Sequence, residues 1–304
     1  MQLDAFHFSV RSPHAIVRVT GPDAGQFLQG QFSNNLQQGF GEVVYGLWLN
    51  QKGRVVADSH VFCVAKEDFL VVSDNAPASL VLQRLGEYLI ADEVELADES
   101  ADWSGLSVDG HGSAEFVAAR FGGMPASGHF LAGENGMAYR RRCGAGENFE
   151  LLGPREKIAA LVAAARALGA EKCTEEIEYR RILAGIPAVP QDIGPGDLPA
   201  EGGLDETAVS YTKGCYLGQE VMARLKNLGQ VRRRLHVLKG TGPAPAPLTP
   251  LYQGARQVGV VRSSANLAGT TVAHGMFSLL QLDAGAGVSL SPDTAPSFSI
   301  VPHG

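Results

Sequence analysis

The chain has 304 residues, of which 45% are hydrophobic and 19% charged, a balance typical of a folded protein with two or three domains. Its formal net charge of −7 excludes a broad nucleic-acid-binding surface, because phosphate binding needs a basic field. The sequence has no apolar run of membrane-spanning length and no signal-like N-terminus, so we expect a cytoplasmic protein without membrane contact.

The first part of the chain predicts a strand, a helix and then a meander of strands. Residues 15–20 alternate apolar and polar side chains as a strand does, and residues 21–32 predict a helix with a proline near its start. Residues 43–73 contain three strand-like runs, which are broken at residues 51–53 and 65–68.

The middle of the chain mixes helices with short strands. Four segments have the apolar spacing or the start and stop signals of helices: residues 77–89, 113–121, 154–170 and 174–185. Strand-like runs lie at residues 137–142 and 148–153. Because strands and helices do not alternate regularly, the sequence predicts an α+β fold rather than a doubly wound sheet.

The last part of the chain predicts a long loop, a strand and a small β module. Residues 186–203 contain too many Pro and Gly residues for regular structure, and such long loops in compact proteins are usually functional. Residues 231–240 predict a strand, and residues 241–250 a Pro-rich linker. Beyond the linker, short strand-like runs occupy residues 257–263, 277–282 and 288–291.

The sequence contains none of the motifs of P-loop nucleotide binding, zinc proteases or serine hydrolases. The four cysteines, Cys63, Cys143, Cys173 and Cys215, stand far apart, which argues against both a zinc site and a disulfide framework. The histidines also lack partners at the spacing of metal ligands. We therefore expect a reduced protein without a metal centre.

One segment, SYTKGCYLGQEVMAR at residues 210–224, places a cysteine next to the start of a predicted helix. A helix that begins near Tyr216 or Leu217 would point free N–H groups at Cys215, and Lys213 would add a nearby cation. Both effects favour thiolate over thiol, so Cys215 would be reactive. The alternative is a small buried residue that only packs at a helix start.

The octapeptide KGCYLGQE, at residues 213–220, resembles the signature of the YgfZ-type folate-binding proteins, which are relatives of the glycine cleavage T-protein, an aminomethyltransferase. Other segments are similar to the same family in the same order: FLQGQFSNNL, LNQKGRVVAD, RRILAGIPAVPQDI and PAEGGL. The likeness extends from Ala15 to Leu235, and the octapeptide is its most specific part.

The resemblance implies two α+β domains around a central folate cavity, followed by a small C-terminal β-barrel. It also implies that the second domain is inserted into the first. On this basis we expect the first domain at residues 1–46 and 143–235, the inserted domain at residues 47–142 and the barrel at residues 236–304.

The resemblance assigns chemistry to three acidic residues. Asp58 matches a carboxylate that lies beside the folate ring nitrogens and assists one-carbon transfer, whereas the alternative is a strand acid paired with Arg54. Glu150 matches a carboxylate that receives the N–H groups of the pterin, and Glu147 is the second choice because the spacing is one residue short.

The match to the T-protein is incomplete. A folate-contacting arginine of that family is replaced by Ile177 or Glu178, which speaks against the full catalytic set of an aminomethyltransferase. Arg181 matches only a nearby second arginine. The candidate cofactor-binding residues nevertheless include Arg181 and, from the octapeptide, Lys213, Gln219 and Glu220.

Three functions remain open. The resemblance favours a tetrahydrofolate-binding accessory protein that assembles or repairs iron-sulfur enzymes, including tRNA-modifying ones, with Cys215 and Asp58 as catalytic residues. Its expected partners are folate and iron-sulfur client proteins. The second function is a tetrahydrofolate-dependent aminomethyl or methyl transferase, which Asp58 supports and which needs no thiol. The third is a folate-binding module without chemistry.

Overall fold

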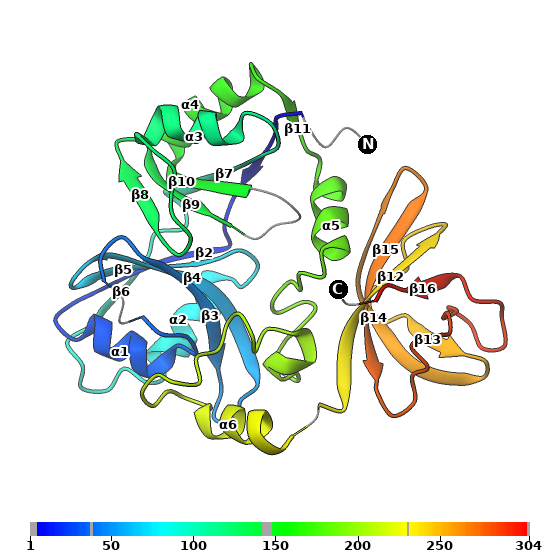
Figure 1. The fold of residues 1–304 in the computed structure, drawn as a ribbon. Coiled ribbons are helices and arrows are strands. Elements are labelled where there is room, and N and C mark those ends of the chain that lie inside the picture. Colours follow the sequence, from blue (N-terminus) through cyan, green and yellow to red (C-terminus); the bar gives the residue numbers. More distant parts are fainter. Residues whose placement is uncertain (1–4, 37–38, 142–147, 230, 303–304) are drawn as a thin grey trace.

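The strands form three sheets, which Figure 1 shows as three lobes around the middle of the molecule. The computed structural model describes residues 5–36, 39–141, 148–229 and 231–302.

The first sheet is antiparallel, has the order β3-β4-β5-β2-β6 and carries two helices on one face. The apolar faces of the helices, with Phe27 and Leu28 in one and Val81 and Leu85 in the other, are buried against it. The elements are β2 (Ala15–Thr20), α1 (Ala24–Gln31), β3 (Val43–Leu49), β4 (Val55–Ala65), β5 (Asp68–Ser73), α2 (Ala78–Gly86) and β6 (Glu95–Asp98).

The second sheet has the order β11-β1-β7-β10-β9-β8 and also carries two helices. Alternation along β10 buries Phe149 and Leu151 against these helices and turns Glu150 to the other face. The elements are β1 (His7–Arg11), β7 (Trp103–Asp109), α3 (Ser113–Phe121), β8 (Phe130–Gly133), β9 (Gly136–Arg140), β10 (Asn148–Pro154), α4 (Arg155–Arg166) and β11 (Ala170–Glu171).

The two sheets pack against each other through their helix-free faces. Phe62 and Leu70 of the first sheet meet Tyr139 and Leu152 of the second in one buried cluster, and the rings of Phe62 and Tyr139 lie edge to face at 5.0 Å. Burying each such side chain contributes about 1.5–3 kcal/mol. This interface therefore holds the two α+β units in a fixed relation, so that polar residues at its edge keep their spacing.

The third sheet lies apart from the other two and is curled (Figure 1). Backbone pairs of Tyr252 with Ser289 and of Val288 with Phe298 join its two edge strands, and this confirms the small C-terminal β-barrel. The strands are β12 (Arg233–Thr241), β13 (Pro250–Gln253), β14 (Arg256–Leu267), β15 (Thr270–Ser278) and β16 (Phe298–Ile300).

A connecting segment joins the α+β units to the barrel. It consists of α5 (Thr174–Leu183), a long loop with the short 3-10 helix η1 (Pro199–Gly202), and α6 (Gln219–Leu228). In α5, Tyr179 and Ile182 are buried against Ala265 and Val272 of the barrel. Ion pairs of Arg233 with Asp197 and Glu201 fasten the loop to the barrel as well.

The predicted α+β class is confirmed, but the predicted domain boundaries do not follow the strand pairing. The boundary after residue 46 cuts β3, which pairs with β4 continuously from Val43 to Trp48. The boundary after residue 142 separates β9 from its partner β10. Because each cut would break a hydrogen-bonded ladder, the sheets divide the chain elsewhere: residues 15–98 form the insertion between β1 and β7.

Two strand predictions in the barrel are corrected. The strand predicted at residues 277–282 ends at Ser278, and the chain then turns, leaving Leu280 87% exposed. The run at residues 288–291 contributes only the two isolated bridges that close the barrel. In both cases a short apolar run predicted a strand, but packing in the folded protein gives most of these residues another conformation.

Candidate functional site

A cavity of about 1000 Å³ lies where the two α+β units, the long loop and the barrel meet. All of these parts contribute to its wall, so the site exists only in the folded whole. The wall residues used below are Arg11, Tyr45, Asp58, His60, Asp74, Arg141, Ile177, Glu178, Arg181 and His274.

Asp58 points from β4 toward this cavity. Its Oδ2 accepts a hydrogen bond of 2.9 Å from the Tyr45 hydroxyl, whereas its Oδ1 is buried and has no hydrogen-bond partner among the described residues. Burial, and then the negative charge of Asp74, raise the pKa of Asp58 to about 7. The predicted alternative, a pair with Arg54, is wrong, because Arg54 instead donates to the Gly196 carbonyl.

Glu150 lies on β10 next to Arg11 and Arg141, which line the cavity, but it is not itself a wall residue, and its side chain is only 3% exposed. It accepts a very short hydrogen bond from Ser107, which is its direct neighbour on β7. Burial raises the pKa of Glu150 to about 7, although Arg11 and the Ser107 hydroxyl act in the opposite direction. Gly105 leaves room for this carboxylate, since a Cβ there would lie 2.6 Å from Glu150 Oε1.

Two arginines and a third carboxylate complete the group. Asp74 pairs with Arg11 at 2.9 Å and, more closely, with Arg141, and both arginines also approach Glu150, at 3.9 Å and 3.4 Å. We call Asp58, Asp74 and Glu150 the acid cluster. Because the three carboxylates outnumber the two guanidinium groups, one proton on Asp58 or Glu150 balances the charge, which agrees with their raised pKa values.

Beside the acid cluster the wall is aromatic. The His60 ring lies 5.1 Å from the ring of Tyr45 and 5.4 Å from that of Tyr139. Burial lowers the pKa of His60 to about 4, so the ring is neutral at physiological pH. A planar ligand could therefore stack on uncharged rings while its edge faces carboxylates.

Arg181 lines the cavity, but its donors are already used within the protein. It binds Glu178, Asp192 at 2.7 Å, the Ile186 carbonyl at 2.6 Å and the Ser263 hydroxyl at 3.2 Å. This guanidinium thus joins α5, the long loop and the barrel. It is placed to hold the cavity wall together rather than to bind a ligand directly.

His274 in this wall and Asp192 behind it form a second buried pair. Asp192 is fully buried, and its Oδ2 lies 3.0 Å from Nδ1 of His274 on β15 and 2.8 Å from the Ala188 N–H that donates to it. The pKa of Asp192 lies well below its usual range, because the effect of burial is outweighed by the hydrogen bond with His274, by the positive charge of Arg181 and by the hydrogen bond from the Ala188 N–H.

The octapeptide segment, residues 213–220, lies away from the cavity. Lys213 is buried, and its ammonium group donates to the carbonyls of Gln29, Phe32 and Asn34 at 2.7–2.9 Å. These carbonyls belong to the end of α1 and the residues after it, so Lys213 fastens the segment to the first sheet. Burial lowers the pKa of Lys213 to about 8.

Cys215 is exposed, but two expectations about its surroundings are wrong. The helix begins at Gln219 rather than near Tyr216, so Cys215 lies three residues before the N-cap, Gly218. The ammonium group of Lys213 is engaged by carbonyls and is no counter-ion for a thiolate. Gly218 has φ +85°, and a Cβ there would lie 2.9 Å from the Asn50 carbonyl, which fixes the turn against the β3–β4 hairpin.

The remaining predicted site residues fall outside the cavity wall. Gln219 donates weakly to the Lys213 carbonyl at 3.4 Å, and Glu220 is exposed in the first turn of α6. Glu147 and Cys143 lie outside the described residues. Within the described ranges, no group of three or more His, Cys, Asp or Glu side chains is arranged to hold a metal ion. None of the helices in those ranges is long and apolar enough to cross a membrane.

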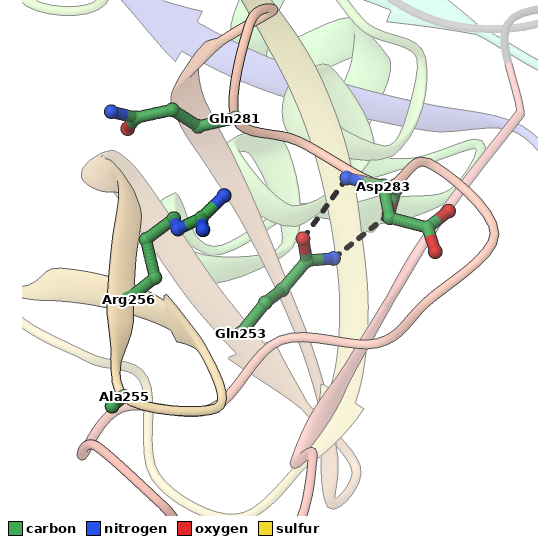
Figure 2. A pocket seen from close by; sticks show the side chains of 5 residues that line it. All are labelled: Gln253, Ala255, Arg256, Gln281 and Asp283. Atoms are coloured by element: carbon green, nitrogen blue, oxygen red, sulfur yellow. Dashed lines mark hydrogen bonds between the residues drawn. The ribbon is translucent and has the colours of Figure 1, made fainter.

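A smaller surface pocket lies at the tip of the barrel (Figure 2). Figure 2 shows that Gln253 spans it and is hydrogen-bonded to the backbone of Asp283 in both directions. Arg256 and Gln281 complete its polar rim. The pocket has no buried acid or base, so its contacts serve to fix the loop after β15.

Sequence reasoning missed five residues that shape the cavity: Arg11, Asp74, Arg141, Asp192 and His274. None of them belongs to a recognisable motif, and they come from five separate elements or loops. One signal was present, because Arg141 lies in an arginine triplet at the end of the strand predicted at residues 137–142. Asp192 was part of the quoted loop motif, but its partners lie on other elements.

Comparisons with known proteins agree on one family. Residues 11–213 match the GCVT N-terminal domain. The human mitochondrial iron-sulfur cluster assembly factor IBA57 is 30% identical over 253 residues, which cover 77% of this chain and 67% of that protein. The tRNA-modifying protein YgfZ of Serratia proteamaculans is 26% identical over 306 residues, which cover 95% of this chain and 89% of that protein.

A solved structure extends the comparison to the fold. The crystal structure of the glycine cleavage system aminomethyltransferase T from Bartonella henselae matches with a TM-score of 0.79 at 18% identity, over 94% of this chain and 81% of that chain. At this identity the match establishes a shared three-part fold. The chain spans between 53% and 67% of the length of the IBA57 relatives that it matches.

Proposed function

Because the chain belongs to the GCVT N-terminal domain family, as a YgfZ-type relative of the glycine cleavage T-protein, we propose that it binds tetrahydrofolate or a one-carbon derivative in the central cavity. We further propose that it acts as an accessory protein in the assembly or repair of iron-sulfur enzymes, including enzymes that modify tRNA. The observation that carries the folate proposal is the pair of buried carboxylates, Asp58 and Glu150, with raised pKa values beside a cavity of ligand size.

The residues of the cavity suit a reduced pterin. The ring edge of a pterin presents several N–H donors, and a buried carboxylate is the best acceptor for two parallel donors. Asp58 has a buried oxygen without a hydrogen-bond partner among the described residues. An N–H group of a bound ligand would supply the missing hydrogen bond. The rings of Tyr45 and His60, which are tilted by 43° to each other, supply aromatic faces next to that oxygen.

The two acids have different tasks in this proposal. Glu150, held between Ser107 and the two arginines, accepts the donors of the pterin edge and fixes its orientation. Asp58 holds or releases a proton at the ring nitrogens, because a pKa of about 7 makes both of its forms accessible near neutral pH. A bound tetrahydrofolate supplies a nitrogen that carries a one-carbon unit.

The iron-sulfur part of the proposal rests on the relatives and on Cys215. IBA57 is named as an iron-sulfur cluster assembly factor and YgfZ as a tRNA-modifying protein. Cys215 is exposed on a segment that the contacts of Lys213 and Gly218 hold against the first sheet. A thiol presented in this way is accessible to a client protein or its cluster, at a place separate from the folate cavity.

Calorimetric titration with tetrahydrofolate tests the folate proposal. Glu150→Gln keeps the shape of the side chain but replaces one acceptor by a donor, so we expect the affinity to fall about tenfold or more. Glu176→Gln is the matched control, because Glu176 pairs with Arg180 outside the cavity wall. Equal affinities of wild type and Glu150→Gln would reject the assignment of Glu150.

The iron-sulfur proposal is tested in a cell that lacks its own copy of the protein. We expect wild type to restore the activity of iron-sulfur enzymes, and Cys215→Ser and Glu150→Gln to restore it poorly. Full restoration by Cys215→Ser would remove the thiol from the proposed mechanism and leave the segment a structural one.

A second candidate function, aminomethyl or methyl transfer to tetrahydrofolate, is supported by Asp58. Its unpartnered oxygen and its pKa of about 7 suit an acid or base at a folate nitrogen. Against it, Ile177 and Glu178 stand in the cavity wall where the T-protein has a folate-contacting arginine. We therefore expect little or no methylene-tetrahydrofolate from an aminomethyl donor. Steady turnover that Asp58→Asn abolishes would make the transferase the preferred function.

A further inference from the structure

The barrel contributes a histidine to the cavity wall whose outer nitrogen is unsatisfied. His274 lies in the middle of β15 and is 1% exposed. Its Nδ1 faces Asp192 at 3.0 Å, and its Nε2 is buried with no hydrogen-bond partner among the described residues. Leaving a buried polar atom unpaired costs about 1–3 kcal/mol, so this nitrogen calls for a partner that the described residues do not provide.

Asp192 determines which hydrogen bonds the His274 ring can make. In the tautomer that donates Nδ1–H to this carboxylate, Nε2 carries no proton and is a hydrogen-bond acceptor. Asp192 is itself held by Arg181 at 2.7 Å and by the Ala188 N–H at 2.8 Å, so the carboxylate cannot turn away. These contacts of Asp192 fix the orientation of the His274 ring, as neighbouring hydrogen bonds often do for a ligand-binding side chain.

The position of His274 indicates which part of a ligand it meets. The acid cluster belongs to the two α+β units, whereas His274 belongs to the barrel, on the other side of the connecting segment with α5 (Figure 1). A ligand whose ring edge lies at Asp58 and Glu150 therefore extends its remaining part toward the barrel. The amide of a p-aminobenzoylglutamate tail carries an N–H that can donate to an acceptor there.

We propose that Nε2 of His274, oriented by Asp192, accepts a hydrogen bond from the p-aminobenzoylglutamate part of a folate in the central cavity. The inference rests on the proposed folate site and assigns the barrel a direct part in ligand binding. It makes His274 a binding residue that distinguishes a complete folate from a bare pterin, and Asp192 its positioning residue.

Two ligands and two variants test the assignment by calorimetry. Tetrahydrofolate carries the tail, and methyltetrahydropterin has the same ring system without it. His274→Asn keeps an amide at the position of Nδ1, where it can still bind Asp192, but removes the group at Nε2. His274→Gln instead places an amide near the position of Nε2, where its oxygen can accept.

We expect His274→Asn to bind tetrahydrofolate about tenfold more weakly than wild type and to bind methyltetrahydropterin unchanged. His274→Gln should recover part of the lost affinity for tetrahydrofolate. Thermal unfolding of both variants verifies that the fold is intact, and if one variant does not fold, the other is compared with wild type alone.

The alternative outcomes have distinct meanings. If His274→Asn and His274→Gln bind tetrahydrofolate as tightly as wild type, the histidine only ties the barrel to the loop, and the inference is wrong. The same conclusion follows if the variants lose affinity for both ligands equally. If wild type binds neither ligand, the folate site itself is rejected, and the assignment of His274 falls with it.

Discussion

The acid cluster and the octapeptide segment differ in how fully their buried charged groups are paired. In the cluster, Asp58 has a buried oxygen without a partner in the described part of the chain, and Asp58 and Glu150 have pKa values raised to about 7. In the segment, the Lys213 ammonium group has three carbonyl partners. Incomplete pairing is typical of a binding site, and complete pairing of a structural support.

Because of this difference, the most recognisable motif of the sequence and the titratable groups of the cavity lie in two different regions. The octapeptide is the most recognisable stretch of the sequence, yet the contacts of Lys213 and Gly218 hold it against the first sheet, with Cys215 exposed on the surface. The acid cluster has no compact motif, yet it concentrates the titratable groups of the cavity. The following predictions test whether the two regions are as independent as their contacts indicate.

Replacing Lys213 should have the largest effect, and on stability alone. Lys213→Met removes three charge-assisted hydrogen bonds and leaves buried carbonyls unpaired, so we expect the free energy of unfolding to fall by about 3 kcal/mol. Urea unfolding measures the loss. Lys52→Met, at the exposed tip of the neighbouring hairpin, is the control and should change stability by less than about 0.5 kcal/mol.

The folded Lys213→Met protein should also bind tetrahydrofolate as wild type does, because Lys213 does not line the cavity. A marked loss of folate affinity in this variant, under conditions where it remains folded, would show that the octapeptide segment and the acid cluster are not independent.

The acid cluster should make stability depend on pH in the opposite sense to an ordinary ion pair. Asp58 has a pKa of about 7 in the folded state against an ordinary value of 3.8. Between these values the folded state holds more protons than the unfolded state, so stability falls as pH rises through that window and levels off above it. Glu150 acts in the same direction.

Asp58→Asn removes this penalty. We expect the variant to be more stable than wild type by about 2 kcal/mol near pH 8, and to show no gain at about pH 2.5, where the carboxyl is largely protonated in both states. Unfolding curves across this pH range measure the difference. Asp192→Asn is the contrasting variant: the pKa of Asp192 is depressed, so its contribution is present at neutral pH and is lost only as pH falls below its ordinary value.

Filling the space beside Glu150 should have a smaller effect on stability. A Cβ at Gly105 would meet Glu150 Oε1, so Gly105→Ala pushes the carboxylate away from Ser107 and costs about 1 kcal/mol. The same variant should bind tetrahydrofolate more weakly. Gly30→Ala, a helix position with open space around it, is the control and should be neutral or slightly stabilising. Unchanged folate affinity in Gly105→Ala would show that the position of Glu150 does not matter for binding.

Much of the fold was accessible from the sequence, because it depends on local patterns. Residues 113–121 carried the apolar spacing of a helix and form α3, and the alternation in residues 15–20 predicted β2 with both ends correct. The start of α6 was placed too early, since Gly218 adopts a left-handed conformation that delays the helix and cannot be recognised from composition alone.

The site was accessible only in part. The resemblance identified Asp58 and Glu150, whereas the cluster around them depends on the packing of two sheets, which brings Arg11, Asp74 and Arg141 together from distant positions. The predicted environment of Cys215 was wrong for a similar reason. Sequence distance placed Lys213 beside the thiol, but its long side chain reaches the carbonyls at the end of α1 instead.

The most direct test of the account is the affinity of the Cys215→Ser protein for tetrahydrofolate, measured by titration calorimetry next to wild type and Glu150→Gln. If the cavity binds folate and the octapeptide segment serves a separate surface, Cys215→Ser will bind within about twofold of wild type, while Glu150→Gln binds about tenfold or more weakly. A loss of affinity in Cys215→Ser as large as that in Glu150→Gln would contradict the separation of the two regions.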